Sequence, residues 1–191
     1  MTRAQDRPAR TFTYRRILQV TRDGYTTGTR LLADATRQRF GPITAVIGVA
    51  NGGTAPAVSL GELLATPVYR VDARHNPTDA PYTPATGHVT CEAGPLAAAL
   101  DGRLLAGRVL LVDDICGTGA TLHALRPALI PHMAPGAAVN TAVLCRNTGA
   151  AHDPDLWLWT VDDWVRFPWE PSPPPGAKTE NLPVPSKVLP R

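Results

Sequence analysis

Two adjacent carboxylates and a glycine-rich turn stand directly after an apolar, strand-like run at 108–112. The carboxylates are Asp113 and Asp114, and the turn after them comprises Ile115, Cys116, Gly117, Thr118, Gly119, Ala120 and Thr121. Glycines let a backbone turn tightly, so the N–H groups of the turn and of a helix beginning there can bind a phosphate. Threonine hydroxyls can donate to the same oxygens, while carboxylates accept hydrogen bonds from vicinal sugar hydroxyls. The segment therefore predicts a site for a phosphorylated sugar.

The same residues have two other interpretations. A buried strand can end in two spare acids before an N-capped helix without binding anything, but strand, acid pair, turn and helix occur here in register. A hydrolase or phosphatase would use the acid pair to hold a metal, yet no histidine or further acid stands at metal-site spacing. The pattern GxxxxGK[ST] is absent, so the turn is not a P-loop.

A second glycine turn, Ala50-Asn51-Gly52-Gly53, follows the continuous apolar run at 43–49. Such a run is typical of a strand buried on both faces. Helical spacing begins at Gly53 and continues to residue 64. Taken alone, Asn-Gly-Gly is an ordinary turn. Its place between a buried strand and a helix, earlier in the chain than the acid pair, favours a second loop that binds a ligand through its backbone.

The elements that must position these turns alternate along the chain. Strands are expected at 43–49, 67–71, 108–112, 138–145 and 156–161, and helices at 53–64 and 118–130. This alternation predicts an α/β fold with a central parallel sheet, right-handed crossovers and flanking helices. Ligands of such sheets bind at the carboxyl ends of the strands, where both glycine turns stand.

The chain divides into a leader at 1–10, one domain at 11–170 and a proline-rich tail at 171–191. Within the domain, 73–95 lacks apolar periodicity and is interpreted as a flap over the site, with a β-hairpin compatible. Proline cannot donate to regular backbone hydrogen bonds, so the tail is either an extended arm on its own domain or a partner subunit, or a solvated segment. The solvated segment is the favoured interpretation.

Composition restricts the remaining choices. Hydrophobic residues make up 43% and charged residues 18% of the chain, as in globular proteins. The net charge of +3 is mild and the Lys and Arg residues are scattered, so a nucleic-acid partner is not indicated. Three widely spaced cysteines predict free thiols in a reducing cytoplasm. No signal-like segment and no membrane-length apolar run occurs, which predicts a soluble cytoplasmic protein.

With these motifs the chain resembles the type I phosphoribosyltransferases. The resemblance implies 5-phosphoribosyl 1-pyrophosphate as donor, Mg²⁺ as cofactor and a homodimer or tetramer. It implies that Asp113 and Asp114 hold the ribose and, mainly through the ligand, the metal, while 116–121 bind the 5-phosphate. The turn of Ala50, Asn51, Gly52 and Gly53 would bind pyrophosphate. Many members carry Arg or Lys where this chain has Asn51, so pyrophosphate charge must be neutralised more by magnesium or by another group.

A third segment, 162–170, is similar to the hood of the 6-oxopurine phosphoribosyltransferases, especially the bacterial xanthine–guanine and archaeal hypoxanthine types. The resemblance implies a hood at 152–170 in which Trp164 stacks on the base and Val165 offers main-chain contacts. It also implies that Arg146 reaches the 6-oxygen of a purine. The alternative for Trp164 is hydrophobic packing or a subunit interface, and Trp169 is assigned a structural role.

The chain departs from these relatives at Gly117, where they commonly carry an acid that manages the proton on the base. Four flap residues are weak candidates to replace that acid: His75, Asp79, His88 and Glu92. The expected activity is transfer of a phosphoribosyl group to a ring nitrogen of a purine-like nucleobase or related heterocycle, with release of pyrophosphate. The alternative is a non-catalytic protein that senses phosphoribosyl pyrophosphate.

Overall fold

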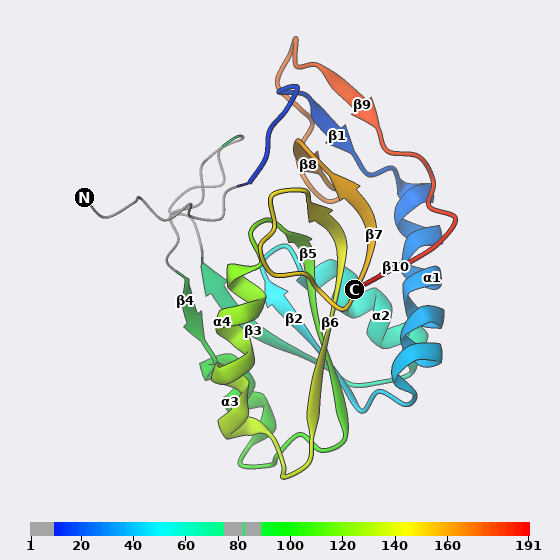
Figure 1. Cartoon of the computed structure of the whole chain (residues 1–191). Coiled ribbons are helices and arrows are strands. Elements are labelled where there is room, and N and C mark those ends of the chain that lie inside the picture. Colours follow the sequence, from blue (N-terminus) through cyan, green and yellow to red (C-terminus); the bar gives the residue numbers. More distant parts are fainter. Residues whose placement is uncertain (1–9, 75–81, 83–88) are drawn as a thin grey trace, which may run out of the picture.

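A seven-stranded sheet forms the centre of the computed structural model, which describes residues 10–74, 82 and 89–191 (Figure 1). The strand order is β10-β7-β6-β5-β2-β3-β4. The five central strands are parallel, and a short antiparallel strand lies at each edge. The parallel strands are β2 (Ala45–Ala50), β3 (Val68–Arg74), β5 (Arg108–Cys116), β6 (Ala138–Asn147) and β7 (Leu156–Val161), and the edge strands are β4 (Thr90–Glu92) and β10 (Leu189–Pro190). The predicted α/β fold is confirmed.

Helices cover both faces of this sheet (Figure 1). On one face lie α1 (Arg22–Phe40) and α2 (Thr54–Leu64); on the other lie α3 (Gly94–Leu100) and α4 (Ala120–Leu129), which a short 3₁₀ turn extends. Neighbouring strand residues alternate between the two cores: Val46 belongs to the first and Ile47 to the second. This alternation explains the continuous apolar runs. Within the described ranges, no helix is long and apolar enough to span a membrane.

A second, smaller sheet is built from segments far apart in the sequence. Its order is β8-β1-β9, with β1 (Ile17–Gln19) between β8 (Trp164–Arg166) and β9 (Thr179–Asn181), and all pairing is parallel. Leu18 on β1 is in register with Val165 on β8. The predicted hood segment is thus joined to both ends of the described chain.

The proline-rich tail lies across its own domain, so the favoured solvated tail is wrong. Its β9 pairs with β1 and its β10 pairs with β7. Between the two strands Pro185 is buried, and the indole N–H of Trp159 donates to the carbonyl of Pro183 at 2.9 Å. Prolines fit here because the two strands are short and belong to sheet edges, where few ladder donors are needed.

Truncating the chain after residue 177 is expected to lower the free energy of unfolding by about 3 kcal/mol or more. The truncation removes two strand pairings and exposes apolar surface of β7, and burial of each large apolar side chain contributes roughly 1.5–3 kcal/mol. Urea denaturation of the truncated and full chains measures the difference. Equal stability would contradict a structural role for the tail.

The predicted flap at 73–95 is only partly described. Its start belongs to β3, its end to β4 and α3, and β3 and β4 pair as antiparallel strands. His75, Asp79 and His88 lie outside the described residues. Glu92 is exposed at the end of β4, in register with Asp72. A lid function for this segment stays a prediction.

Candidate active site

The acid pair lies inside β5, which continues four residues beyond the predicted strand end. Asp113 is in register with Val143 of β6, and the backbone N–H of Asp114 donates to the Asp113 carboxylate at 2.9 Å. The chain then turns through Gly119, whose φ of 84° lies in the left-handed region that favours glycine. Gly119 gives α4 no side-chain cap, so the start of this helix presents backbone N–H groups beside the acids.

The second glycine loop packs directly against the acid pair. A Cβ atom on Gly52 would overlap the Asp114 carboxylate, and one on Gly53 would stand 2.5 Å from the carbonyl oxygen of Val112. Glycine is therefore required at both positions for β2 and β5 to lie this close. The peptide bond between Ala50 and Asn51 is cis. The structure thus brings the predicted pyrophosphate loop and the predicted ribose site together.

Burial and nearby negative charge make both carboxylates weaker acids than usual. Burial raises the pKa of Asp114 to about 6, with repulsion from Glu170 as the next cause. Burial and the neighbouring Asp114 raise the pKa of Asp113 well above its ordinary range. Arg10 opposes both shifts, because its positive charge favours the ionised carboxylates. The pair is thus suited to ligands that bring hydrogen-bond donors or positive charge.

The predicted phosphate turn is held by the loop at 150–153. The carbonyl of Thr118 accepts from the N–H of Ala151 at 3.1 Å, and the Cys116 thiol donates to the carbonyl of His152 at 3.3 Å. Burial raises the pKa of the Cys116 thiol to about 12, so this group stays neutral beside a phosphate. All three cysteines are free, as predicted.

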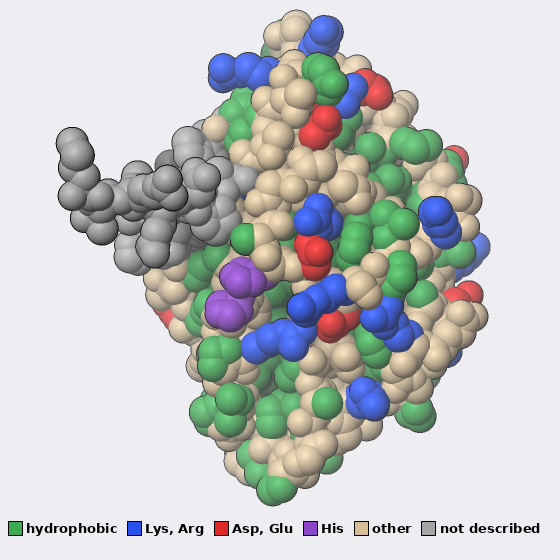
Figure 2. Space-filling view, viewed as in Figure 1, with side chains coloured by type: hydrophobic (Ala, Val, Ile, Leu, Met, Phe, Trp, Pro, Cys, Tyr) green, Lys and Arg blue, Asp and Glu red, His purple; other side chains and the backbone are tan. Residues whose placement is uncertain are grey.

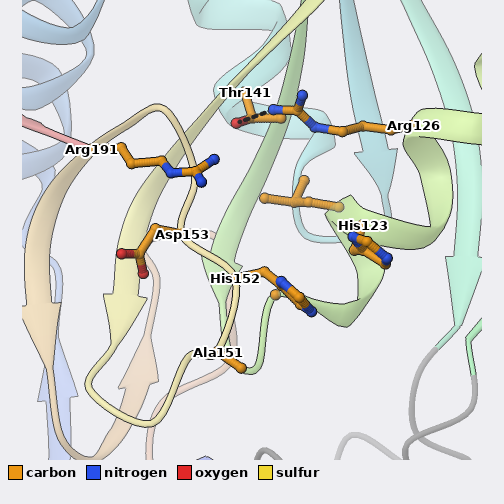
Figure 3. Close-up of a pocket in the computed structure, with 9 residues that line it drawn as sticks. His123, Arg126, Thr141, Ala151, His152, Asp153 and Arg191 are labelled. Carbon is orange, nitrogen blue, oxygen red and sulfur yellow. Dashed lines mark hydrogen bonds between the residues drawn. The ribbon is translucent and has the colours of Figure 1, made fainter.

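A polar cavity of about 330 Å³ lies where this loop meets α4 (Figure 3). His123 and His152 stack at one end with ring centroids 4.5 Å apart, and they lie beside a mixed arginine and acid cluster on the surface (Figure 2). At the other end Arg126 forms an ion pair with Asp155 at 3.2 Å. Because Arg126 is paired with Asp155 and Arg146 with Asp153, we interpret these walls as supports for the turn.

Trp164 stands in an aromatic cluster that contacts Arg10, whose charge also acts on the acid pair. Phe12 and Tyr82 each have ring centroids 6.3 Å from that of Trp164, and the guanidinium of Arg10 lies 5.1 Å above its ring. Val165 follows on β8, which is an edge strand of the small sheet, so one side of its backbone is not paired within that sheet. Stacking by Trp164 and backbone contacts from Val165 stay predictions that this arrangement permits.

Arg146 is already engaged. Its Nε donates to Asp153 at 2.5 Å, Nη2 donates to the carbonyl of Ala150 at 3.3 Å, and the guanidinium lies 5.9 Å from the Trp157 ring centroid. The contact of Arg146 with a purine 6-oxygen stays a prediction. For that contact the guanidinium would have to bind the oxygen alongside Asp153 or give up its bond to Asp153. Trp169 stacks on Phe167 at 5.0 Å, consistent with a structural role.

The sequence interpretation missed Arg10, which was assigned to the leader at 1–10. The other nine leader residues lie outside the described part of the chain, but Arg10 is half-buried next to Gly117. A signal for this segment exists: Thr11-Phe12-Thr13-Tyr14 alternates β-branched and aromatic residues, which favours an extended, partly buried backbone.

Comparison with known proteins agrees with this geometry. A family model described as "Phosphoribosyl transferase domain" matches residues 18–175. A xanthine-guanine phosphoribosyltransferase from Gluconobacter oxydans (strain 621H) is 29% identical over 157 residues, which cover 80% of this chain and 85% of that protein. The crystal structure of a purine phosphoribosyltransferase from Pyrococcus horikoshii Ot3 matches with a TM-score of 0.64 and 26% identity, over 82% of this chain and 96% of that one.

A xanthine-guanine-hypoxanthine phosphoribosyltransferase from Helicobacter pylori shares the fold, with a TM-score of 0.59 and 19% identity over 82% of this chain and 93% of that one. The family model covers most of the chain, and it includes both glycine turns, the acid pair and Trp164. The chain therefore belongs to the phosphoribosyltransferase family and is an enzyme of that family.

Proposed function

We propose that this enzyme transfers a 5-phosphoribosyl group from phosphoribosyl pyrophosphate to a ring nitrogen of a purine-like heterocycle and releases pyrophosphate. The observation that carries the proposal is the contact between the Asp114 carboxylate and Gly52, which joins the two glycine loops at one place. A sugar held by the acid pair would have the glycine turn and the start of α4 on its phosphate side and the Gly52 loop on its leaving-group side. Trp164, which Arg10 links to the same acids, would stack on the acceptor.

Each group has a distinct part in the reaction. Asp113 and Asp114 accept hydrogen bonds from the ribose hydroxyls and stabilise positive charge that develops on the ring as the bond from C1 to pyrophosphate breaks. The N–H groups from Gly117 to Thr121 hold the 5-phosphate and thereby fix the sugar. The acceptor nitrogen then attacks C1 from the opposite face, and the electron pair of the broken bond leaves with pyrophosphate.

The residues of the site fit magnesium held mainly through the donor. Carboxylate oxygens suit Mg²⁺, and the raised pKa values of Asp113 and Asp114 show a site that positive charge would relieve. No group of three or more His, Cys, Asp or Glu side chains that could hold a metal occurs among the residues described. Asp113 and Asp114 would therefore share the ion with the oxygens of the donor. Bound magnesium would neutralise charge on pyrophosphate.

The test is pyrophosphate release from phosphoribosyl pyrophosphate and magnesium, with hypoxanthine, guanine, xanthine, adenine and pyrimidines supplied singly. We expect turnover with at least one oxopurine and none when magnesium is chelated. Donor binding without turnover on any acceptor would contradict the proposed function and favour a sensor of phosphoribosyl pyrophosphate.

Replacing Trp164 with Ala is expected to raise the KM for the acceptor about 10-fold or more and to leave the KM for the donor unchanged. Stacking of a base on an aromatic side chain contributes roughly 1–3 kcal/mol, and only the acceptor would lose it. Initial rates at varied acceptor and donor concentrations separate the two constants. Trp169→Ala is the matched control, because Trp169 stacks on Phe167 instead. An unchanged acceptor KM in Trp164→Ala would leave Trp164 a packing residue.

A further inference from the structure

Arg10 places a cation on the acceptor side of the site. Its Cδ and Nε lie 2.9 and 3.0 Å from where a Cβ atom on Gly117 would stand, and its guanidinium faces the rings of Trp164 and Phe12. Among the residues that the structure describes, the buried Nε has no hydrogen-bond partner. Arg10 also forms no ion pair within 4.0 Å in the described part of the chain. A buried, charged N–H donor without a partner is unfavourable, and a ligand that accepts a hydrogen bond there would relieve it.

The backbone next to Arg10 is fixed by two buried polar side chains. The amide of Asn147 accepts from the N–H of Thr11 at 2.8 Å and donates to its carbonyl at 3.0 Å. Asp163 accepts from the N–H groups of Tyr14 and Arg15 at 3.1 and 3.0 Å. Asn147 and Asp163 are both fully buried. The segment is thus anchored through its backbone, and no carboxylate of the described residues forms an ion pair with the Arg10 side chain.

The acids around Arg10 have other partners. Asp163 is occupied by backbone N–H groups, Asp153 by Arg146, and the proposed function assigns Asp113 and Asp114 to the ribose. A neutral acceptor with an N–H must lose that proton when its nitrogen bonds to C1, and a guanidinium cannot accept a proton. An acceptor that has already lost the proton needs only a cation to hold its charge, and Arg10 is that cation.

We propose that Arg10 is a specificity-determining residue that selects acceptor heterocycles reacting as ring-nitrogen anions. This inference rests on the proposed function and narrows its substrate class to heterocycles in which the N–H of the attacking ring nitrogen is acidic. The proton leaves to solvent before the acceptor binds. The anionic nitrogen forms its bond to C1 with its own electron pair while the bond from C1 to pyrophosphate breaks. No proton is transferred to the protein in this step.

The test compares hypoxanthine with its 8-aza analogue, in which nitrogen replaces one C–H group and makes the ring N–H more acidic with little change of shape. We expect the native enzyme to favour the more acidic acceptor at neutral pH. In Arg10→Gln the kcat/KM for the 8-aza analogue should fall about 100-fold, and its advantage over hypoxanthine should disappear. The reason is that the anionic acceptor would be buried without a cation to balance its charge, which is costly. Arg10→Lys should restore part of the preference.

One control variant and three contrary outcomes complete the test. Arg15→Gln removes a nearby exposed arginine that faces Tyr82 and should leave the preference intact. A loss in Arg10→Gln that appears in the donor KM, equally for all acceptors, would overturn the inference and assign Arg10 to phosphoribosyl pyrophosphate. Faster turnover of both acceptors in Arg10→Gln would overturn it too, because Arg10 would then obstruct the site. Absence of turnover on any acceptor would instead refute the proposed function.

Discussion

Replacing Asp114 with Asn is expected to lower kcat/KM about 1000-fold while making the ligand-free protein more stable at neutral pH. Under the proposed function, the activity falls because the ribose hydroxyls lose hydrogen bonds to an ionised carboxylate, each contributing roughly 1.5–3 kcal/mol. Two such bonds correspond to about three powers of ten in rate. Steady-state kinetics with saturating acceptor measures this loss.

The stability gain follows from the raised pKa of Asp114. Its pKa is about 6 in the folded chain against an ordinary value of 3.8. A group shifted in this direction contributes its full stability below 3.8, and that contribution is lost as pH rises through about 6. By neutral pH the native chain has lost roughly 3 kcal/mol of its free energy of unfolding in this way. The Asp114→Asn variant keeps that free energy because Asn cannot ionise.

Urea denaturation at acid and neutral pH tests the second half of this result. The stability difference between Asp114→Asn and the native chain should be small near pH 4 and should grow as the pH passes about 6. Asp101→Asn serves as control, because Asp101 is exposed in the turn after α3 and should change neither activity nor stability. A difference that stays constant with pH would disprove the electrostatic explanation.

The change of Gly53 to Ala is expected to reduce the free energy of unfolding by about 2–3 kcal/mol and kcat/KM by about 100-fold. The added Cβ would stand 2.5 Å from the Val112 oxygen, 2.7 Å from the Val49 oxygen and 2.8 Å from the Asp113 Cα. All three are backbone atoms, so the overlap is relieved only when β2 and β5 move apart. That movement displaces the acid pair from the Gly52 loop, and a displacement near 1 Å can cost about 100-fold in rate.

Gly94→Ala is the matched control for this prediction. A Cβ on Gly94 would meet no atom within 4 Å, and Gly94 does not have a positive φ. Thermal unfolding and initial rates of the two variants give the comparison. If Gly53→Ala matched Gly94→Ala in both stability and rate, the close approach of β2 and β5 would not be needed for activity.

The large sheet could be predicted from the sequence because each parallel strand is a local apolar run. Buried strands are recognisable as continuous apolar runs, and Gly or Asp marks their ends. The five parallel strands were therefore predicted with boundaries within a few residues of those observed. The acid pair and both glycine turns stand at those ends. Their meeting in space follows from the rule that ligands bind at the carboxyl edge of a parallel sheet.

The hood and the tail could not be predicted in the same way. Strands β1, β8 and β9 have three residues each, too few for any periodicity to be visible. Their stability comes from partners distant in sequence, such as Asp163, which binds the backbone of Tyr14 across a separation of 149 residues. Arg10 was missed for this reason, because its position depends on Asn147 and Asp163.

The order in which the small sheet can assemble follows from its central strand. During synthesis β1 is made before both of its partners, β8 and β9, which lie within 164–181. The glycine loops of β2 and β5 come from the middle of the chain and depend on nearer contacts, which form faster. A nascent chain halted before residue 164 can therefore pair β2 with β5 and bring the two glycine loops together, but it cannot form the small sheet. The β1 backbone then stays unpaired while the central strands of the large sheet form.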